Sequence, residues 1–275
     1  MAKYNIKINL SALNAVLQRS IQRTIDIVSL GLISAEQITD TGALKLPGAF
    51  FHVSPAANFH LDFESARTEF KKWALMGGIR DCIEAVNTFL ESVHPICFLY
   101  SVGSPLKGEV WNIGMNSKTR INFHKRGLPS KIDFLVTEYA PILRPELTDE
   151  VISINKARNC MVHRNGIVSV LDKNSEDGLL VRWRKIQFIA KGPNGQRAVT
   201  GGSIVKAGEE LSIQQVESHK LFLIGESISF PVEEFSELCL TVMLFGRQLV
   251  DNINNYGRTR GIQFNPKNDK GLTLD

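Results

Sequence analysis

The spacing of apolar residues changes twice along this chain, and those changes do most to limit its fold. Over much of residues 65–166, and again after residue 230, apolar residues recur every three or four positions, which is the period of an α-helix. Between residues 167 and 230 apolar and polar residues alternate instead, as in a half-buried β-strand. We therefore expect a mainly α (α+β) fold: a helical bundle with a β-hairpin or small sheet inserted before the last helix.

The same pattern predicts how the chain is divided. We expect residues 1–64 to form an N-terminal helix and an irregular segment, both packed on the bundle. The helical domain should span residues 65–256 and carry the β insertion at about 167–230. Residues 257–275 are polar and contain glycine and proline, so we expect a flexible tail there.

Residues typical of helix ends mark where the helices should begin and stop. Ser11 and Thr148 are the expected N-caps of two helices, because their side chains can accept hydrogen bonds from the first turn. The residue before a proline is pushed out of the helical region, so His94-Pro95 should end the second helix. Pro231 should be the first residue of the last helix. The expected helices are 11–30, 65–92, 129–139, 148–165 and 231–255.

The other segments should be strands, turns or loops. Strands are predicted at 179–190, 221–224 and 227–230, with a turn over 192–195, where an Asn-Gly step lies. Residues 42–63 combine prolines and glycines with short aromatic runs, which favours loop and a strand pair. Residues 103–126 are polar and are expected to be a long surface loop.

Composition narrows the class of protein without identifying a function. The chain has 275 residues, 43% of them hydrophobic and 22% charged, which is typical of a globular protein and not of a disordered one. The run Leu238–Phe245 is too short to cross a bilayer, and the start of the chain has no apolar secretion-signal core, so we expect a cytoplasmic protein with no membrane contact. A net charge of +4 allows a polyanionic partner but does not require one.

The cysteines indicate neither a metal site nor a disulfide framework. The four are far apart in the sequence and include no C-x-x-C pair, so we expect no metal and no cofactor, and interpret them as small buried hydrophobic residues. They are Cys82, Cys97, Cys160 and Cys239.

One arginine lies on the apolar side of the helix that begins at Thr148. At 100° per residue, Arg158 falls in the sector of the apolar residues Val151, Ile154 and Ala157. The opposite side of the helix carries the residues Thr148, Asp149, Ser153, Asn155, Lys156 and His163. Because a guanidinium is rarely buried without a partner, Arg158 needs either a carboxylate across the bundle or an anion from outside.

His163 follows Arg158 by five residues and can exchange a proton near neutral pH. Five residues turn a helix by about 140°, so the two side chains would diverge on an ideal helix. The following Asn165-Gly166 should end the helix, which would let the imidazole lean toward the side that Arg158 reaches. A structural alternative is equally open. Arg158 could form an ion pair with Glu84 or Asp81, and His163 could be a helix-end cation.

The segment Ala157-Arg-Asn-Cys-Met-Val-His-Arg-Asn-Gly166 resembles the R-x4-6-H signature of the HEPN superfamily. The upstream helix over residues 73–90 is similar to the long helix that packs against the motif helix in these bundles. The resemblance covers about half of the chain. The β-rich stretch over 167–230 departs from the compact bundle of that family.

The resemblance implies a metal-independent endoribonuclease that serves bacterial defence or a toxin–antitoxin system and works as a homodimer. In that role Arg158 would hold the scissile phosphate and His163 would act as general acid or base. Asn159 would orient the phosphate or the histidine, Glu84 would support Arg158, and Arg164 would contact the RNA backbone. The implied partners are RNA, a second copy of the chain and an antitoxin protein. The alternative is a non-catalytic module of the same type that binds RNA, a nucleotide or a protein.

Two further features have a functional and a structural interpretation. Lys125-Arg126, together with the segment Arg182-Trp-Arg-Lys185, combines positive charge with an aromatic ring and could bind RNA, although alternating charges on the outer face of a strand are the commoner case. Gly77-Gly78 lies inside a helix and is expected to be a site of close packing, since the sequence has no phosphate-loop motif.

Overall fold

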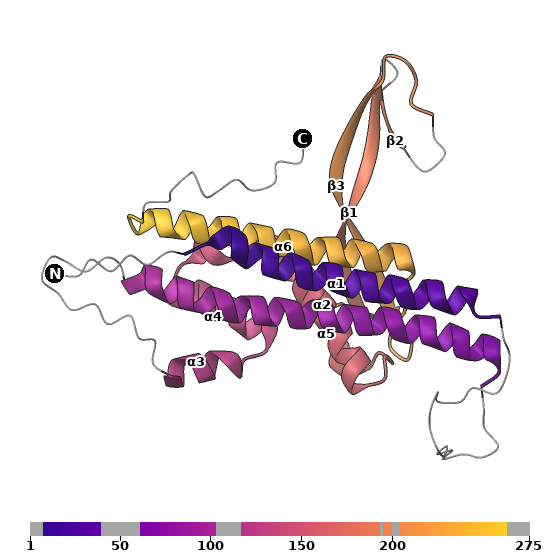
Figure 1. Ribbon diagram of the computed structural model, residues 1–275, viewed down its shortest axis with the longest axis horizontal. Helices are drawn as coiled ribbons and strands as arrows, with labels where there is room; N and C mark the ends of the chain where they lie inside the picture. The colour runs from indigo at the N-terminus through magenta and orange to yellow at the C-terminus, as the bar shows by residue number, and fades with distance from the viewer. Residues whose placement is uncertain (1–7, 40–60, 103–116, 193–194, 200–203, 263–275) are drawn as a thin grey trace, which may run out of the picture.

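Three long helices, α1 (Leu10–Gln37), α2 (Phe63–Val102) and α6 (Val232–Thr259), lie side by side and each packs on the other two (Figure 1). The computed structural model describes residues 8–39, 61–102, 117–192, 195–199 and 204–262. The shorter helices α3 (Ser117–His124), α4 (Leu128–Glu138) and α5 (Thr148–His163) complete the bundle, with the 3-10 turns η1 (Pro141–Leu143) and η2 (Val170–Asp172).

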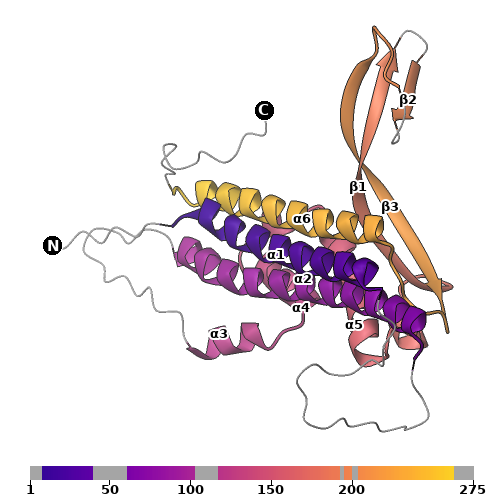
Figure 2. The ribbon, with the colours of Figure 1, turned by 45° about the vertical axis from the view of Figure 1, so that its right-hand side comes forward.

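The β insertion is a three-stranded antiparallel sheet between α5 and α6, so the expected fold class is confirmed. Its order is β2-β1-β3, with β1 over Gly178–Gly192, β2 over Gly195–Val199 and β3 over Glu210–Leu223. The first part of β1 packs on α5 and α6, while the far part of β1 rises away from the bundle as an arm with β2 and the first part of β3 (Figure 2).

Strand β3 is longer and starts earlier than the sequence predicts. It pairs with β1 from Gly178 opposite Leu223 to Lys191 opposite Glu210. Most side chains of β3 are exposed or half-buried, because the arm has solvent on both faces. An alternation of apolar and polar residues therefore could not mark this strand. The expected strand at 227–230 is wrong: Ser227 makes only an isolated bridge to Ile167.

Helix α2 continues through Pro95, against the expectation that it ends there. Proline inside a helix removes one backbone hydrogen bond and costs about 3 kcal/mol. The turns beyond it are nevertheless covered, because Cys97 and Tyr100 are each at most 2% exposed. Their burial outweighs the local cost, so tertiary packing decides the length of this helix.

In three helices the N-cap or the first helical residue differs from the one that the sequence predicts. The N-cap of α1 is Asn9, whose side chain accepts from the Ala12 amide at 3.0 Å. Thr148 is the first residue of α5 and its hydroxyl donates backwards to the Pro145 carbonyl at 2.6 Å. Pro231 occupies the cap position of α6 and is not its first helical residue.

Two expected loops can be compared only in part. The segment expected over 42–63 falls mainly on residues 40–60, which lie outside the described residues. Of the loop expected over 103–126, residues 117–124 are helix α3, and 103–116 are not described. The expected tail begins inside α6, and residues 263–275 are again not described.

The core confirms the interpretation of the cysteines as small buried residues, since all four are buried. Gly78 is a close-packing site as expected: a Cβ there would lie 2.7 Å from the Phe235 ring and 2.8 Å from Val28. Gly77, by contrast, has open space on its free side. No helix within the described ranges is both long and apolar enough to cross a membrane.

Candidate functional site

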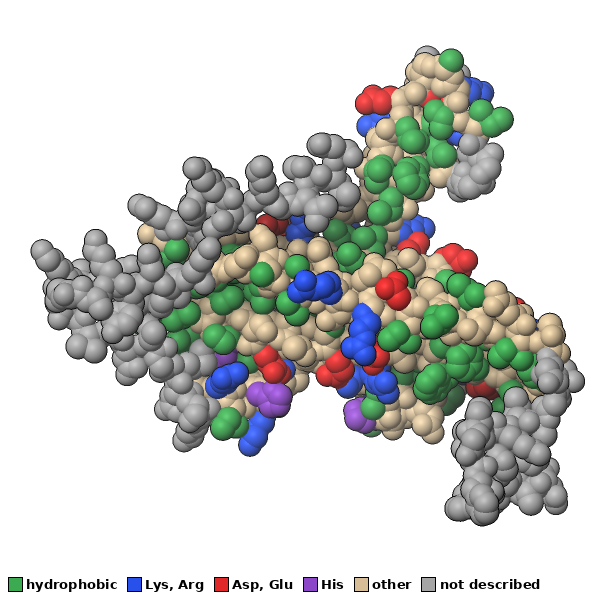
Figure 3. Space-filling view, viewed as in Figure 1, with side chains coloured by type: hydrophobic (Ala, Val, Ile, Leu, Met, Phe, Trp, Pro, Cys, Tyr) green, Lys and Arg blue, Asp and Glu red, His purple; other side chains and the backbone are tan. Residues whose placement is uncertain are grey.

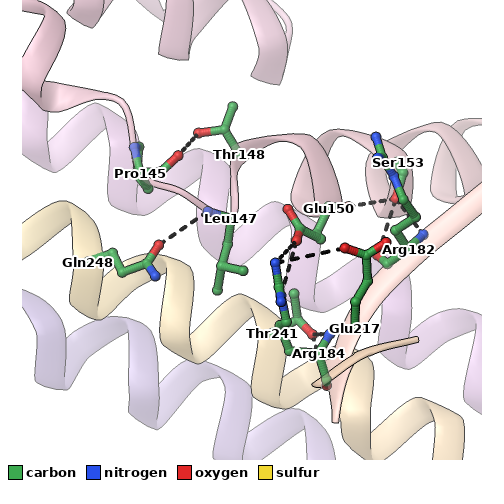
Figure 4. A network of polar contacts seen from close by, with 10 residues as sticks. All are labelled: Pro145, Leu147, Thr148, Glu150, Ser153, Arg182, Arg184, Glu217, Thr241 and Gln248. Carbon is green, nitrogen blue, oxygen red and sulfur yellow. Dashed lines mark hydrogen bonds and ion pairs between the residues drawn. The ribbon is translucent and has the colours of Figure 1, made fainter. Parts of the chain in front are cut away.

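Helix α5 is held in place by polar side chains that face the sheet, among them Glu150, which lies within the sector that the sequence assigns to apolar residues. The carboxylate of Glu150 accepts two hydrogen bonds from Arg184 of β1, at 2.8 and 3.1 Å (Figure 4). The Ser153 hydroxyl accepts from the backbone amide of Arg182 at 2.9 Å. Thr148, Glu150 and Ser153 are at most 5% exposed. These polar groups are therefore buried and satisfied. The side that the sequence predicts to be polar is not what the sheet covers, since Asp149 and His163 are exposed.

The same network joins α5 to α6. The Arg184 amide donates to the Thr241 hydroxyl at 2.8 Å, and the Leu147 amide donates to Gln248 at 3.2 Å (Figure 4). Because α5 is fixed by the sheet on one side and by α6 on another, its remaining side is left to face α2 and the solvent. That side carries Arg158.

Arg158 lies at the seam between α5 and α2. Its Nη2 forms an ion pair with Glu84, and its Nη1 donates to the Asn159 carboxamide at 3.0 Å. Of the two carboxylates that the sequence left open, Glu84 is the partner, since Asp81 lies 3.2 Å from Arg80. The Arg158 side chain is 21% exposed and that of Glu84 is 51% exposed. Arg158 is thus half-buried and still reachable from solvent.

Arg158, Asn159 and Glu84 form one end of an open groove with a volume of about 510 Å³. The groove runs between α2, α4 and α5, and Lys131 and Glu91 line it farther along. Polar and charged side chains dominate its lining, so it suits a polar ligand better than an apolar one.

His163 is placed apart from this groove. It is the last residue of α5, is exposed, and does not line the groove. The chain turns away directly after it, because Asn165 and Gly166 both have positive φ, at 52° and 74°. A left-handed residue after a helix is a common way to end it, as the sequence predicts. The structure therefore brings together Arg158, Asn159 and Glu84, and leaves His163 at the neighbouring helix end.

Arg164 is engaged inside the protein. Its Nε donates to Asp172 of η2 at 2.8 Å, and its Nη2 forms a second contact with the same carboxylate. Burial alone would raise the pKa of Asp172, but the hydrogen bonds from Arg164 and Ser169 hold that pKa below its usual range. A bidentate pair to a carboxylate 1% exposed ties the end of α5 to the following turn.

Of the remaining basic candidates, one lines the groove and the others do not. Arg126 is exposed, lines the groove and lies over the Phe134 ring, 4.7 Å from its centre, whereas Lys125 is exposed but does not line the groove. Trp183 is 2% exposed and donates to Glu237 at 2.6 Å, so its ring is part of the core and cannot stack on a base.

Sequence reasoning missed Asn155 as a groove residue. It is 7% exposed and lines the groove, four residues before Asn159. Residues four apart share a helix face, so their spacing was an available signal. The part of the chain that the structure describes holds no group of three or more His, Cys, Asp or Glu side chains that could bind a metal ion.

The surface next to the groove is partly apolar. Trp73 of α2 is 69% exposed and Phe70 is 39% exposed, with ring centres 5.9 Å apart. Trp73 precedes Glu84 by eleven residues, so the two point in nearly the same direction from α2. Figure 3 shows charged side chains of both signs and a histidine near the middle of the lower edge, with hydrophobic side chains toward the right-hand end of α2.

Comparison with known proteins adds no relative. No family model matches the chain, and no curated protein and no solved structure matches it.

Proposed function

We propose that this protein is a metal-independent endoribonuclease of HEPN type. The observation that carries the proposal is the position of Arg158. It opens onto a polar groove with Asn159 beside it, while His163 is exposed at the end of the same helix. A cation that reaches solvent and an imidazole nearby are the groups that phosphoryl transfer in RNA requires.

In this mechanism Arg158 binds the scissile phosphate and neutralises the charge that develops on its non-bridging oxygens. His163 removes the proton of the attacking 2′-hydroxyl or donates one to the leaving 5′-oxygen. The products are a 2′,3′-cyclic phosphate and a free 5′-hydroxyl. Glu84 holds Arg158 until the phosphate arrives, and the ion pair with Glu84 has to loosen for the phosphate to bind.

The proposal includes a homodimer. Within one chain His163 lies outside the groove that Arg158 faces, so a second copy that brings its own His163 or closes the groove would complete the site. The exposed residues Phe70, Trp73 and Val162 lie on the two helices that carry Glu84 and His163, and we assign this surface to the dimer contact. Bacterial defence or a toxin–antitoxin system remains the proposed setting.

The test of catalysis uses the purified full chain and single-stranded RNA in EDTA. We expect cleavage with 2′,3′-cyclic phosphate ends, and a loss of about 100-fold or more in Arg158→Ala and in His163→Ala. Arg23→Ala is the control, because it removes an exposed cation of α1 that does not line the groove. Intact RNA with the wild-type chain would overturn the proposal.

The test of the dimer is a solution mass near twice 30.7 kDa. Trp73→Lys should give a monomer that has also lost cleavage. Ile213→Lys on the arm, where the side chain is 65% exposed, should leave both the mass and the activity unchanged. A monomeric wild-type chain that cleaves RNA would remove the dimer from the proposal while leaving the activity.

One observation favours a second function. His163 does not line the groove that Arg158 faces, which is the arrangement expected of a module that binds RNA without cutting it. In that case the wild-type chain and His163→Ala would bind RNA with equal affinity, and neither would cleave it.

A further inference from the structure

The groove contains a second feature suited to an anion, at the end away from His163. Helix α4 begins at Leu128 directly after Gly127, and no side chain caps it. The residues Gly127, Leu128 and Pro129 line the groove. The first amides of a helix have no partner inside the helix, and Pro129 has no N–H to offer. The amides of Leu128 and Ser130 are therefore the donors available at this end.

An independent observation on the facing helix also indicates a ligand there. Asn155 of α5 lines the groove and is only 7% exposed. Among the described residues, its carboxamide has no hydrogen-bond partner. Neither polar atom of its carboxamide is fully buried, so the amide is open to the groove and can donate to a group that enters it.

The charges of the lining favour an anion. It contains four cationic side chains and two carboxylates, Glu84 and Glu91. Both carboxylates are already paired: Glu84 with Arg158, and Glu91 with Lys131 at 2.7 Å and with His124 at 2.9 Å.

Two cations of the lining have no carboxylate partner among the described residues. Lys156 donates to the Lys173 carbonyl at 3.0 Å, which leaves its charge uncompensated. Arg126 lies over the Phe134 ring, 4.7 Å from its centre, and is exposed at the groove. The positive charge that remains in the groove therefore comes from α5 and from the turn before α4.

We propose that the groove binds the phosphate group of a nucleotide at the N-terminus of α4, with Asn155, Lys156 and Arg126 around it. The amides of the first turn and the helix dipole favour the negatively charged oxygens of a phosphate group. Asn155 donates its N–H, and Arg126 and Lys156 supply the counter-charge. The chemical class is a nucleoside phosphate, either a free mononucleotide or one phosphate of a single-stranded RNA.

For RNA, this inference rests on the proposed function and extends it. Asn155 precedes Arg158 and Asn159 by three and four residues, so it lies about 5 Å along the same helix face. A strand whose scissile phosphate lies at Arg158 would then place a neighbouring phosphate at α4. The α4 site would position the strand and would take no part in the chemical step.

The binding test follows amide signals of the ¹⁵N-labelled full chain during titration with inorganic phosphate. We expect saturable shifts at the amides of Leu128 and Ser130 and at the Asn155 carboxamide, in the millimolar range. AMP and a short single-stranded RNA should shift the same signals at lower concentrations. If the mononucleotide binds at least as tightly as the RNA, the ligand is a free nucleotide. The absence of saturable shifts at these groups would overturn the site.

Variants separate this site from general electrostatic attraction. Arg126→Gln should weaken phosphate binding about fivefold or more, whereas Lys125→Gln, a matched loss of charge on the neighbouring residue outside the groove, should change it less than about twofold. Asn155→Asp should abolish binding by placing a carboxylate against the anion. If Asn155→Asp fails to fold, Arg126→Gln still tests whether the α4 site binds phosphate, because Arg126 is exposed. Equal effects of Arg126→Gln and Lys125→Gln would contradict a defined site.

The phosphate-binding test and the RNA-cleavage test can fail independently of each other. Phosphate shifts at α4 in a chain that cleaves no RNA would support this site while overturning the nuclease. RNA cleavage that depends on Arg158 and His163, with no shifts at α4 and an unchanged KM in Arg126→Gln, would support the nuclease while overturning this site.

Discussion

Arg158 and Glu84 form an ion pair that joins α5 to α2 at the rim of a polar groove, with neither side chain fully buried. Glu84 is 51% exposed, so water screens the pair and its contribution to folding is small, on the order of 1 kcal/mol or less. The pair is therefore better placed to hold Arg158 in a functional position than to stabilise the bundle.

Arg158→Ala should accordingly lower the free energy of unfolding by only about 1 kcal/mol, and Glu84→Gln by less. Urea denaturation of both variants measures this, with Lys125→Ala as the control for loss of an exposed cation. A loss of about 3 kcal/mol or more in Arg158→Ala would instead support the structural alternative, in which a buried carboxylate is left unpaired.

Adjacent glycines in α2 should respond to alanine in opposite directions. Gly78→Ala places a methyl group 2.7 Å from the Phe235 ring, so we expect a loss of about 1–3 kcal/mol from overpacking. Gly77→Ala meets no atom within 4 Å and should stabilise the helix by about 0.5–1 kcal/mol. Thermal unfolding of the two variants, compared with the wild type, checks the prediction. A similar melting temperature for both would contradict the packing of α6 on α2 at this point.

The stability of the protein should fall between about pH 6.5 and pH 4 because of His94. This imidazole is 1% exposed, stacks on Phe123 with ring centres 4.2 Å apart, and its Nε2 has no hydrogen-bond partner among the described residues. Burial lowers the pKa of His94 to about 4. In the unfolded chain the pKa of histidine is about 6.5, so below that pH the unfolded state binds more protons and is favoured. Above pH 6.5 both states are neutral at this residue, and it adds no pH dependence.

His94→Phe should remove that part of the pH dependence while filling the same aromatic cluster. The difference between wild type and variant should grow by up to about 3 kcal/mol as the pH falls from 6.5 to 4, measured by urea denaturation at several pH values. His219→Gln, at an exposed position, is the control and should leave the wild-type profile unchanged. A parallel pH profile in His94→Phe would show that His94 is not the group that titrates.

The ion pair between Glu150 and Arg184 should contribute more to stability than the pair between Arg158 and Glu84. Glu150 has a side chain 7% exposed, and Arg184→Ala would leave its charge unpaired against the sheet. We expect a loss of about 2 kcal/mol or more in urea denaturation, because an uncompensated buried charge is costly. Lys185→Ala on the next residue should change stability by less than about 0.5 kcal/mol. Replacing both partners with leucine should recover much of the loss, and an equal loss in the double variant would contradict this account.

The local sequence was informative where a segment has one apolar face and recognisable ends. Helix α5 ends after His163 as Asn165-Gly166 predicts, and the start of β1 alternates as its burial requires. The same reasoning was wrong for α2 and β3. Pro95 is tolerated because distant residues cover the turns that follow it. Strand β3 is stabilised by its pairing with β1, and its more buried positions from Val216 to Phe222 include Ser218 and Lys220, so hydrophobicity does not follow the alternation of burial.

For the candidate site, helix periodicity and the Asn-Gly step predict a cation on the apolar side of α5 and the end of the helix after His163. Three features depend on the folded chain: Glu84 is the partner of Arg158, Asp172 engages Arg164, and His163 lies outside the groove. The physical reason is that helix periodicity sets the direction of a side chain relative to its own axis. What it meets there depends on helices distant in sequence, which pack alongside only in the folded chain.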